Sequence, residues 1–303
     1  MDRFTAMSLL IAAVDAGSLS AVSRQRHMPL ATVSRKISEL EDHLGARLLV
    51  RSTRGLALTD AGREYVAACR NILESVEQAE RVAAGEFVVP RGELVVTAPA
   101  VFGRLYVAPL VSGFLQAHPD ISVRLLLADR ILNLVDDHVD AAVRVGALPD
   151  SDLIATRVGA VNLVVCATPA YLAARGEPVK PADLAGHDCI TFEAQDRIDT
   201  WHFPTAARDL KVPVRTRLAV NTADAAIAAA LDGLGITRVL SYQVDAAIAE
   251  GRLKRLLQDY EPPARPVHVV HASQRRLPLK LRAFFDYVVP RLRTELSESS
   301  ITP

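Results

Sequence analysis

The spacing of apolar residues changes near residue 90, and this change constrains the fold more than any other feature of the chain. Before it, apolar residues recur at intervals of three and four, the period of an amphipathic helix. After it, short β-branched runs alternate with helical stretches, a pattern typical of parallel α/β sheets. The 303 residues also exceed what one hydrophobic core usually serves. The sequence therefore predicts a helical N-terminal domain followed by a larger α/β domain.

Three helices are expected within the first 45 residues. An apolar stripe over 4–14 predicts the first, and Gly17 can end it in a left-handed conformation. A short second helix follows, with Ser18 or Ser20 as its cap. Pro29 fits the first turn of a third helix, whose stripe over 33–44 would be buried. Two short helices separated by a few residues form a helix-turn-helix.

The outer face of the third helix and the segment after it have the chemistry of a nucleic-acid contact. Residues 24–54 hold seven basic and three acidic residues, a net charge of +4 within a chain whose charges otherwise balance. Small, hydroxylated and basic side chains suit the major groove, and a hairpin tipped with arginines can clamp the phosphate backbone. The residues predicted to contact DNA are Ser20, Leu30, Ala31, Thr32, Ser34, Arg35, Lys36, Arg51, Thr53 and Arg54.

A long helix is expected to begin after Thr59 and run to about residue 84. Its apolar residues are spaced alternately by four and three, which makes a heptad seam. Such a seam either packs on its own domain or joins two chains, and we favour dimerisation because the helix has little else to cover. The seam consists of Tyr65, Cys69, Ile72, Val76, Ala79 and Ala83.

No pattern in the sequence points to catalysis, a metal or a cofactor. The three cysteines are far apart and form no C-x-x-C pair, which fits a reducing cytoplasm. His268 and His271 would point to opposite faces of a strand and are a poor metal pair. The 201–203 segment is either an aromatic lip of a cleft or, the favoured interpretation, a surface strand. Neither a secretion signal nor a membrane span is expected.

Many residues at fixed spacings resemble the LysR-type transcriptional regulators. The resemblance covers nearly the whole chain, with no phosphate loop or catalytic triad competing with it. In the first ninety residues it rests on Ala16–Ala21, Thr32–Ile37, Leu40–Gly45, Arg47–Arg51 and Leu58–Gly62. In the remainder it rests on Ala108–Leu110, His118-Pro119, Asp140–Gly146, Pro169–Leu172 and Gly233–Ile236.

The resemblance implies a winged helix-turn-helix, a linker helix and a two-lobed α/β effector domain similar to periplasmic solute-binding proteins. The expected bounds are 1–59 for the DNA-binding domain, 60–84 for the linker helix, 85–92 for a hinge and 93–303 for the effector domain. Lobe I would comprise 93–160 and 267–303, and lobe II 161–266. One departure is that Pro29-Leu30-Ala31 stands where many members have Ser or Gln before Pro. A Gln-to-adenine contact is thus absent, and base preference does not carry over.

A small-molecule effector is expected between the lobes, where strand ends and helix N-termini converge. The apolar 99–102 wall suggests an aromatic or branched organic acid, with Arg130 or backbone N–H groups meeting its carboxylate. Arg144 is alternatively a structural partner of Asp140 or Asp129. For each residue, packing without ligand contact is as plausible. The candidates are Pro99, Ala100, Val101, Phe102, Asp129, Arg130, Arg144, Phe192, Glu193, Asn221 and Thr222.

These observations together predict a cytoplasmic regulator that is not an enzyme and needs no cofactor. Its expected partners are double-stranded operator DNA, the effector, further copies of itself as a homodimer or homotetramer, and RNA polymerase if it activates. A transported solute-binding protein is a weaker alternative because no export signal is present. A hydrolase or ligase using Cys166 or His202 lacks any supporting spacing. A DNA-packaging protein would not need an α/β sensing domain.

Overall fold

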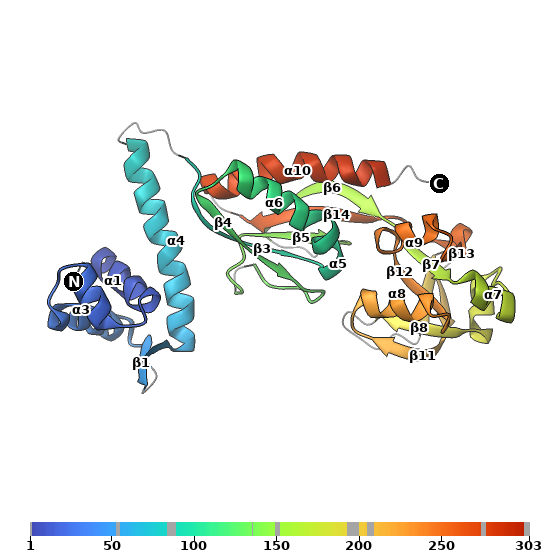
Figure 1. The fold of residues 1–303 in the computed structure, drawn as a ribbon, viewed down its shortest axis with the longest axis horizontal. Helices are drawn as coiled ribbons and strands as arrows, with labels where there is room; N and C mark the ends of the chain where they lie inside the picture. Colours follow the sequence, from blue (N-terminus) through green and yellow to red (C-terminus); the bar gives the residue numbers. More distant parts are fainter. Residues whose placement is uncertain are drawn as a thin grey trace. The chain divides into compact units, whose positions relative to one another are not determined.

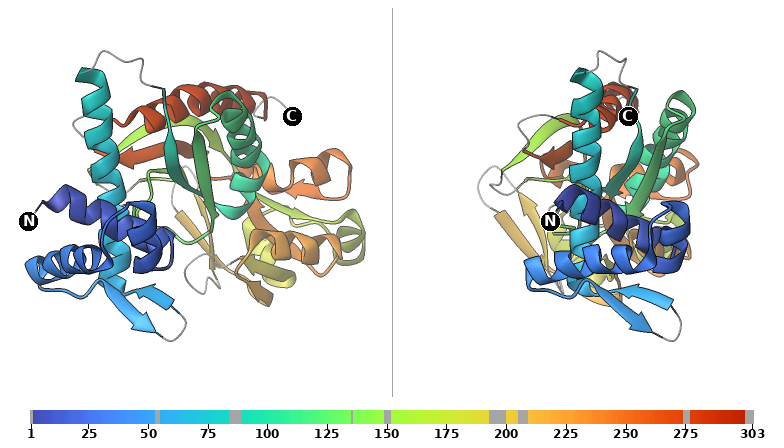
Figure 2. Two further views of the ribbon diagram at one scale, coloured as in Figure 1. Left: turned by 60° about the vertical axis from the view of Figure 1, so that its left-hand side comes forward. Right: turned by 90° about the vertical axis from the view of Figure 1, so that its left-hand side faces the viewer.

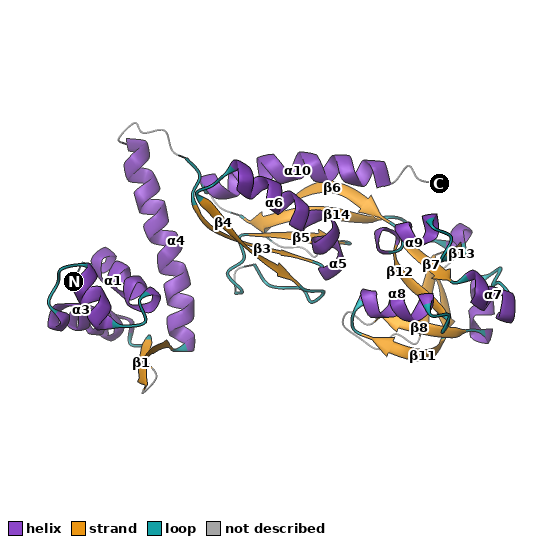
Figure 3. Cartoon of the chain, viewed as in Figure 1, coloured by secondary structure: helices purple, strands orange, loops and turns teal. Residues whose placement is uncertain are grey.

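The computed structural model describes residues 2–52, 55–83, 89–134, 136–148, 152–192, 200–204, 209–273 and 277–299. The chain divides into two compact units, residues 1–89 and 90–303, each with its own hydrophobic core (Figure 1). The first is helical with one small hairpin, and the second is built on two five-stranded sheets (Figure 3). The predicted change of architecture near residue 90 is confirmed.

Each helix of the N-terminal unit begins or ends at a residue suited to that place. The Asp2 side chain accepts a hydrogen bond from Thr5 N at 3.3 Å, and Ser18 accepts one from Ala21 N at 3.4 Å. Gly45, at φ +63°, ends the third helix in the left-handed region. The elements are α1 (Arg3–Asp15), α2 (Leu19–Gln25), α3 (Leu30–Leu44), β1 (Leu49–Ser52), β2 (Gly55–Leu58) and α4 (Asp60–Ala83).

The first sheet of the larger unit has the strand order β4-β3-β5-β14-β6. β3 runs parallel to β4 and β5, whereas β14 runs antiparallel to β5 and β6. Its strands are β3 (Gly92–Ala98), β4 (Ile121–Leu127), β5 (Ala141–Val145), β6 (Leu153–Val161) and β14 (Arg265–Ala272). The helical segments packed on it are α5 (Ala100–Phe102), the π-helical turn η1 (Gly103–Val107), α6 (Ala108–Ala117) and α10 (Leu279–Ser299).

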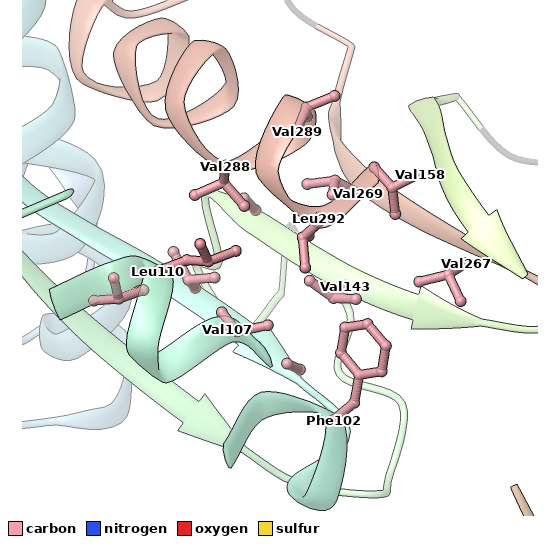
Figure 4. Packing of buried hydrophobic residues seen from close by; sticks show 14 of the residues in the cluster. Phe102, Val107, Leu110, Val143, Val158, Val267, Val269, Val288, Val289 and Leu292 are labelled. Atoms are coloured by element: carbon pink, nitrogen blue, oxygen red, sulfur yellow. The ribbon is translucent and has the colours of Figure 1, made fainter. Parts of the chain in front are cut away.

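One face of this sheet carries the largest core of the protein. Side chains of α6 and α10 interdigitate there with those of β3, β5 and β14, as Figure 4 shows for Leu110, Val143, Val267 and Leu292. Residues 100–117 are apolar enough, by length and composition, to cross a membrane. In this fold they instead cover the sheet, because Phe102 and others on the same side are buried against it.

The second sheet has the strand order β11-β8-β12-β7-β13. Its strands are β7 (Leu163–Ala167), β8 (Asp188–Phe192), β11 (Arg215–Val220), β12 (Ile236–Leu240) and β13 (Lys254–Leu256). α8 (Ala223–Leu231) and α9 (Asp245–Ala249) cover one face. The other face is covered by α7 (Pro169–Arg175), the 3-10 turn η2 (Pro181–Gly186) and the antiparallel hairpin of β9 (Thr200–Pro204) and β10 (Asp209–Pro213). Short 3-10 turns η3 (Ser241–Gln243) and η4 (Gln258–Tyr260) lie in the connections.

Both sheets are mixed, so the expectation of parallel sheets was only partly right. Parallel neighbours need a crossover connection, usually a helix. β14 returns to the first sheet directly from the second, without a crossover helix, and therefore runs against β5 and β6. The return is visible in Figure 2, where orange-red β14 lies among the green strands.

Candidate functional sites

The third helix of the N-terminal unit has one buried face and one exposed face. Val33, Ile37 and Leu40 are at most 3% exposed and pack in the core of that unit. On the opposite face Ala31 and Arg35 are exposed. The helix therefore presents a small residue and a cation one turn apart, with its apolar side fixed against α1 and α2.

Arg35 is the most prominent cation on this face. Its side chain is 69% exposed, and its Nη1 lies 3.9 Å from the Glu39 carboxylate, one helical turn later. Exposed pairs of this kind contribute little, so the guanidinium can exchange this partner for a base or a phosphate. Of the other predicted DNA contacts, Ser20 and Leu30 are also exposed, whereas Thr32, Ser34 and Lys36 are half-buried at the flanks.

A buried carboxylate, Glu41, fixes the wing to the third helix. Its Oε1 accepts hydrogen bonds from the backbone N–H groups of Leu48 at 2.8 Å and Leu49 at 3.0 Å, and its Oε2 accepts one from Arg47 Nη1 at 3.1 Å. Three donors satisfy the charge, which burial would otherwise penalise strongly. Sequence reasoning counted Glu41 only as a charge and missed this role, although its position four residues after Ile37 places it on the buried stripe.

The wing is also joined to the linker helix. Thr59 Oγ1 donates to Arg47 O at 2.7 Å and accepts from Gly62 N at 2.9 Å, so it caps α4 as predicted. A Cβ atom on Gly62 would lie 2.1 Å from Leu48 O, so this close approach requires glycine. Thr53 and Arg54, at the predicted tip, lie outside the described residues, and Arg51 lies on β1 with its side chain outside them.

The predicted heptad seam on α4 divides into two parts. Tyr65 packs against the core of the N-terminal unit and Cys69 is fully buried, which corrects the premise that the helix has little else to cover. An ion pair between Arg70 and Asp15 joins the same part to α1. Ile72, in contrast, is 42% exposed. Farther along, Val76 is half-buried, Ala79 is exposed, and Ala83 ends the helix with its side chain outside the described residues.

The predicted effector wall at 99–102 is only partly open. Val101 and Phe102 are 2% and 0% exposed and belong to the core of the first sheet, so in this conformation they present no surface to a ligand. Pro99 and Ala100 are half-exposed. Ala100 N donates to Asp129 Oδ1 at 3.0 Å and is therefore already engaged.

The remaining predicted effector residues lie in different surroundings. Arg144 Nη2 donates to the backbone carbonyl of Leu132, and burial lowers the pKa of Arg144. Thr222 caps α8 by accepting from Ala225 N at 3.4 Å. Arg130 and Asn221 are exposed, Phe192 is half-buried between the cores of the two sheets, and Glu193 lies outside the described residues.

An aromatic cluster that sequence reasoning missed connects the two lobes. The Tyr242 ring, from η3, lies 5.3 Å from that of Phe102 and 5.9 Å from that of Tyr106, both edge-on. Beside them Arg104 Nη2 lies 3.3 Å from the Asp224 carboxylate on α8. Burial raises the pKa of the Tyr242 hydroxyl, and the Asp129 charge adds to this. No local sequence signal marks these residues, because their proximity depends on how the lobes pack.

Among the described residues, no group of three or more His, Cys, Asp or Glu side chains is arranged to hold a metal ion. His268 and His271 lie on β14; His271 Nδ1 lies 2.8 Å from Ala272 O, and its ring packs edge-on against Phe285. Trp201 and Phe203 of β9 are buried and His202 between them is exposed, the alternation of the predicted strand.

A winged helix-turn-helix followed by a two-lobed α/β domain defines a DNA-binding regulator with a ligand-sensing domain. Residues 4–63 match the bacterial regulatory helix-turn-helix model of the lysR family, and residues 89–293 match the LysR substrate binding domain. The chain belongs to the LysR family of bacterial transcriptional regulators, a non-enzymatic family, as its sequence patterns predicted.

Relatives and solved structures of this family match along almost the whole chain. An HTH-type transcriptional repressor of Pseudomonas aeruginosa (strain UCBPP-PA14) is 33% identical over 305 residues, covering 100% of this chain and 96% of the relative. The HTH-type transcriptional activator AaeR of Escherichia coli (strain K12) is 32% identical, covering 94% and 93%. The structure of CrgA, a LysR-type regulator from Neisseria meningitidis, has a TM-score of 0.61 at 31% identity and covers 95% of this chain and 98% of its own.

Proposed function

We propose that the chain binds a specific operator through α3 and the wing, as a dimer held by the distal half of α4. A small molecule bound between the lobes alters that binding. The observation that carries the DNA contact is the division of α3 into a buried apolar face and an exposed face with Arg35. The site comprises the ten DNA-contacting residues predicted from the sequence, with the wing arginines on the phosphate backbone.

The proposed effector is an aromatic or branched organic acid. Because Val101 and Phe102 are buried and Ala100 N is engaged by Asp129, the ligand meets Pro99 and the Ala100 side chain. The exposed guanidinium of Arg130 is the cation at this wall for its carboxylate. A ligand that contacts both lobes changes DNA binding only by its differential affinity for their arrangements.

The proposed assembly is a homodimer or a homotetramer that acts in the cytoplasm and, if it activates, contacts RNA polymerase. An exposed Ile72 on a heptad seam supports the first step. Two half-sites in the operator would follow from a two-fold dimer.

Two experiments test this function. Sequencing genomic fragments retained by the purified protein should give one recurrent inverted repeat, and retention without any shared sequence would contradict specific binding. Ala100→Trp should then abolish the response of operator affinity to benzoates and branched-chain carboxylates while leaving ligand-free affinity intact. Ser122→Trp, on the exposed surface of β4, is the control. A normal response in Ala100→Trp would place the ligand elsewhere.

A further inference from the structure

Arg238, on β12, has unusual surroundings for a cation. Its guanidinium carbon lies 5.0 Å from the centre of the Trp201 ring and 5.6 Å from that of Phe203, both on the hairpin that covers the second sheet. Its Nη1 donates to His202 O at 3.0 Å. Burial, together with the positive charge of Arg265, the first residue of β14, lowers the pKa of Arg238 to about 10.

Among the described residues, no anion is paired with the charge of Arg238. Within the described ranges no acidic side chain forms an ion pair with Arg238 or Arg265, whereas Asp188 attracts Arg217 at 3.0 Å and two other arginines. A guanidinium has five N–H donors, and of the acceptors in the described residues only the His202 carbonyl takes one. A partly buried cation with unused donors and a second cation nearby favours binding of an anion.

Thr191 adds an unused hydroxyl beside this cation. Its side chain is 3% exposed, and its Oγ1 has no hydrogen-bond partner within the part of the chain that the structure describes. β8 and β12 are neighbours with Ile236 opposite Cys189. Two residues further along each strand come Arg238 and Thr191, on the face that Cys189 and Ile236 share with the hairpin.

We propose that Arg238 and Thr191 form a binding site for a small carboxylate anion on the hairpin-covered face of the second sheet, with the positive charge of Arg265 on β14 adding to the attraction. The planar guanidinium fork matches the two oxygens of a carboxylate, and the Thr191 hydroxyl can donate to one of them. This site differs from the proposed effector wall, because Arg238 and Thr191 lie on β12 and β8 of the second sheet, whereas Pro99, Ala100 and Arg130 flank strands of the first sheet. The anion site and the effector wall can therefore be tested independently of each other.

The chain carries one tryptophan, Trp201, directly beneath Arg238, so its fluorescence reports on the site without a label. Acetate, malonate and benzoate are titrated into the full-length protein at constant ionic strength, with chloride as the reference salt. At least one carboxylate should change the emission with saturation. Arg238→Gln should raise the dissociation constant at least about tenfold, as expected for loss of charge-assisted hydrogen bonds.

Two control variants locate the anion. Arg124→Gln removes an exposed cation from β4 and should bind like the wild type. Arg130→Gln alters the proposed effector wall and should also leave the Trp201 response unchanged. If Arg238→Gln fails to fold, Arg238→Lys replaces it, since it keeps the charge but loses the planar fork.

Absence of saturation with every carboxylate overturns the proposal. So does a response that survives the Arg238 substitution, or one lost in Arg130→Gln but kept in the Arg238 variant. The last result would assign the anion to the effector wall and leave the proposed function standing.

Discussion

The Glu41 carboxylate on α3 accepts the backbone N–H of Leu48 at 2.8 Å, so the DNA-facing helix and the wing share one buried anchor. The anchor joins α3 to β1, the two elements through which we propose that the chain contacts DNA. It is the only acidic side chain among the buried polar residues of the N-terminal unit, within the residues described.

Glu41→Ala should destabilise the N-terminal unit by about 2–4 kcal/mol, because it leaves the N–H groups of Leu48 and Leu49 without their acceptor. Amide hydrogen exchange at Leu48 should accelerate, and operator affinity should fall. Glu39→Ala is the control; its pair with Arg35 is exposed, so it should change stability by less than about 0.5 kcal/mol. Equal effects from both variants would contradict the anchor role.

Gly62→Ala should be more harmful than a typical glycine substitution. The new Cβ would lie 2.1 Å from Leu48 O, a backbone atom that cannot move without disturbing the wing. We expect a loss of about 2–3 kcal/mol, measured by urea denaturation followed by helix circular dichroism. Gly186→Ala meets nothing within 4 Å and should change stability by less than about 1 kcal/mol.

Arg35→Ala should cost about 1–3 kcal/mol of operator affinity and relax preference at one base pair in each half-site. Arg54→Ala should weaken all sequences alike and reduce the salt dependence of binding. Fluorescence anisotropy against operator variants at several salt concentrations separates the two outcomes. Unchanged operator affinity for Arg35→Ala would refute base reading by this residue.

Charged substitutions in the two parts of the α4 seam should have different effects. Ile72→Glu combined with Val76→Glu should weaken self-association, because a dimer would bury two unpaired carboxylates in each chain. Light scattering should then give a lower mass while thermal stability of the N-terminal unit is kept. Cys69→Glu should instead unfold that unit, since Cys69 is buried within its own chain. An unaltered mass in the double variant would place the interface elsewhere.

The raised pKa values of the Cys166 and Cys189 thiols should make the stability of the chain depend on pH in the alkaline range. Burial raises the pKa of Cys166 and of Cys189 to about 12, from an ordinary 9.0. Below pH 9 both states are protonated and stability is unaffected; between about 9 and 12 only the unfolded thiols ionise, so stability falls. Urea midpoints at pH 8 and pH 10 measure this loss, with the Cys166→Ala variant as reference. Rapid alkylation of both thiols at pH 8 without urea would contradict their burial.

Local patterns predicted most of the fold. The apolar stripe that begins at position 33 and the glycine at position 45 led correctly to α3, although Leu44 at the end of the stripe is exposed, because side-chain periodicity and helix ends depend on neighbouring residues. The family resemblance then correctly implied the second sheet.

The side-chain contacts inside the candidate sites were harder to predict from the sequence. The apolar run at 99–102 was interpreted as a ligand wall, yet Phe102 is fully buried against Tyr242, which is 140 residues away in sequence. The same holds for Arg238, whose aromatic neighbours come from another strand. Contacts between distant segments depend on tertiary packing, which periodicity does not encode.

The return of β14 to the first sheet has a topological consequence. Val161, the last residue of β6, is opposite Arg265, the first residue of β14, so the chain leaves the first lobe and re-enters it at one pair of adjacent residues. The second lobe is thus an insertion whose ends are already joined. Because the entropy of closing a loop grows only with the logarithm of its length, lengthening or exchanging this insertion changes the free energy of the first lobe little. The second lobe can therefore diversify while the first sheet, and the core beneath α10, stay the same.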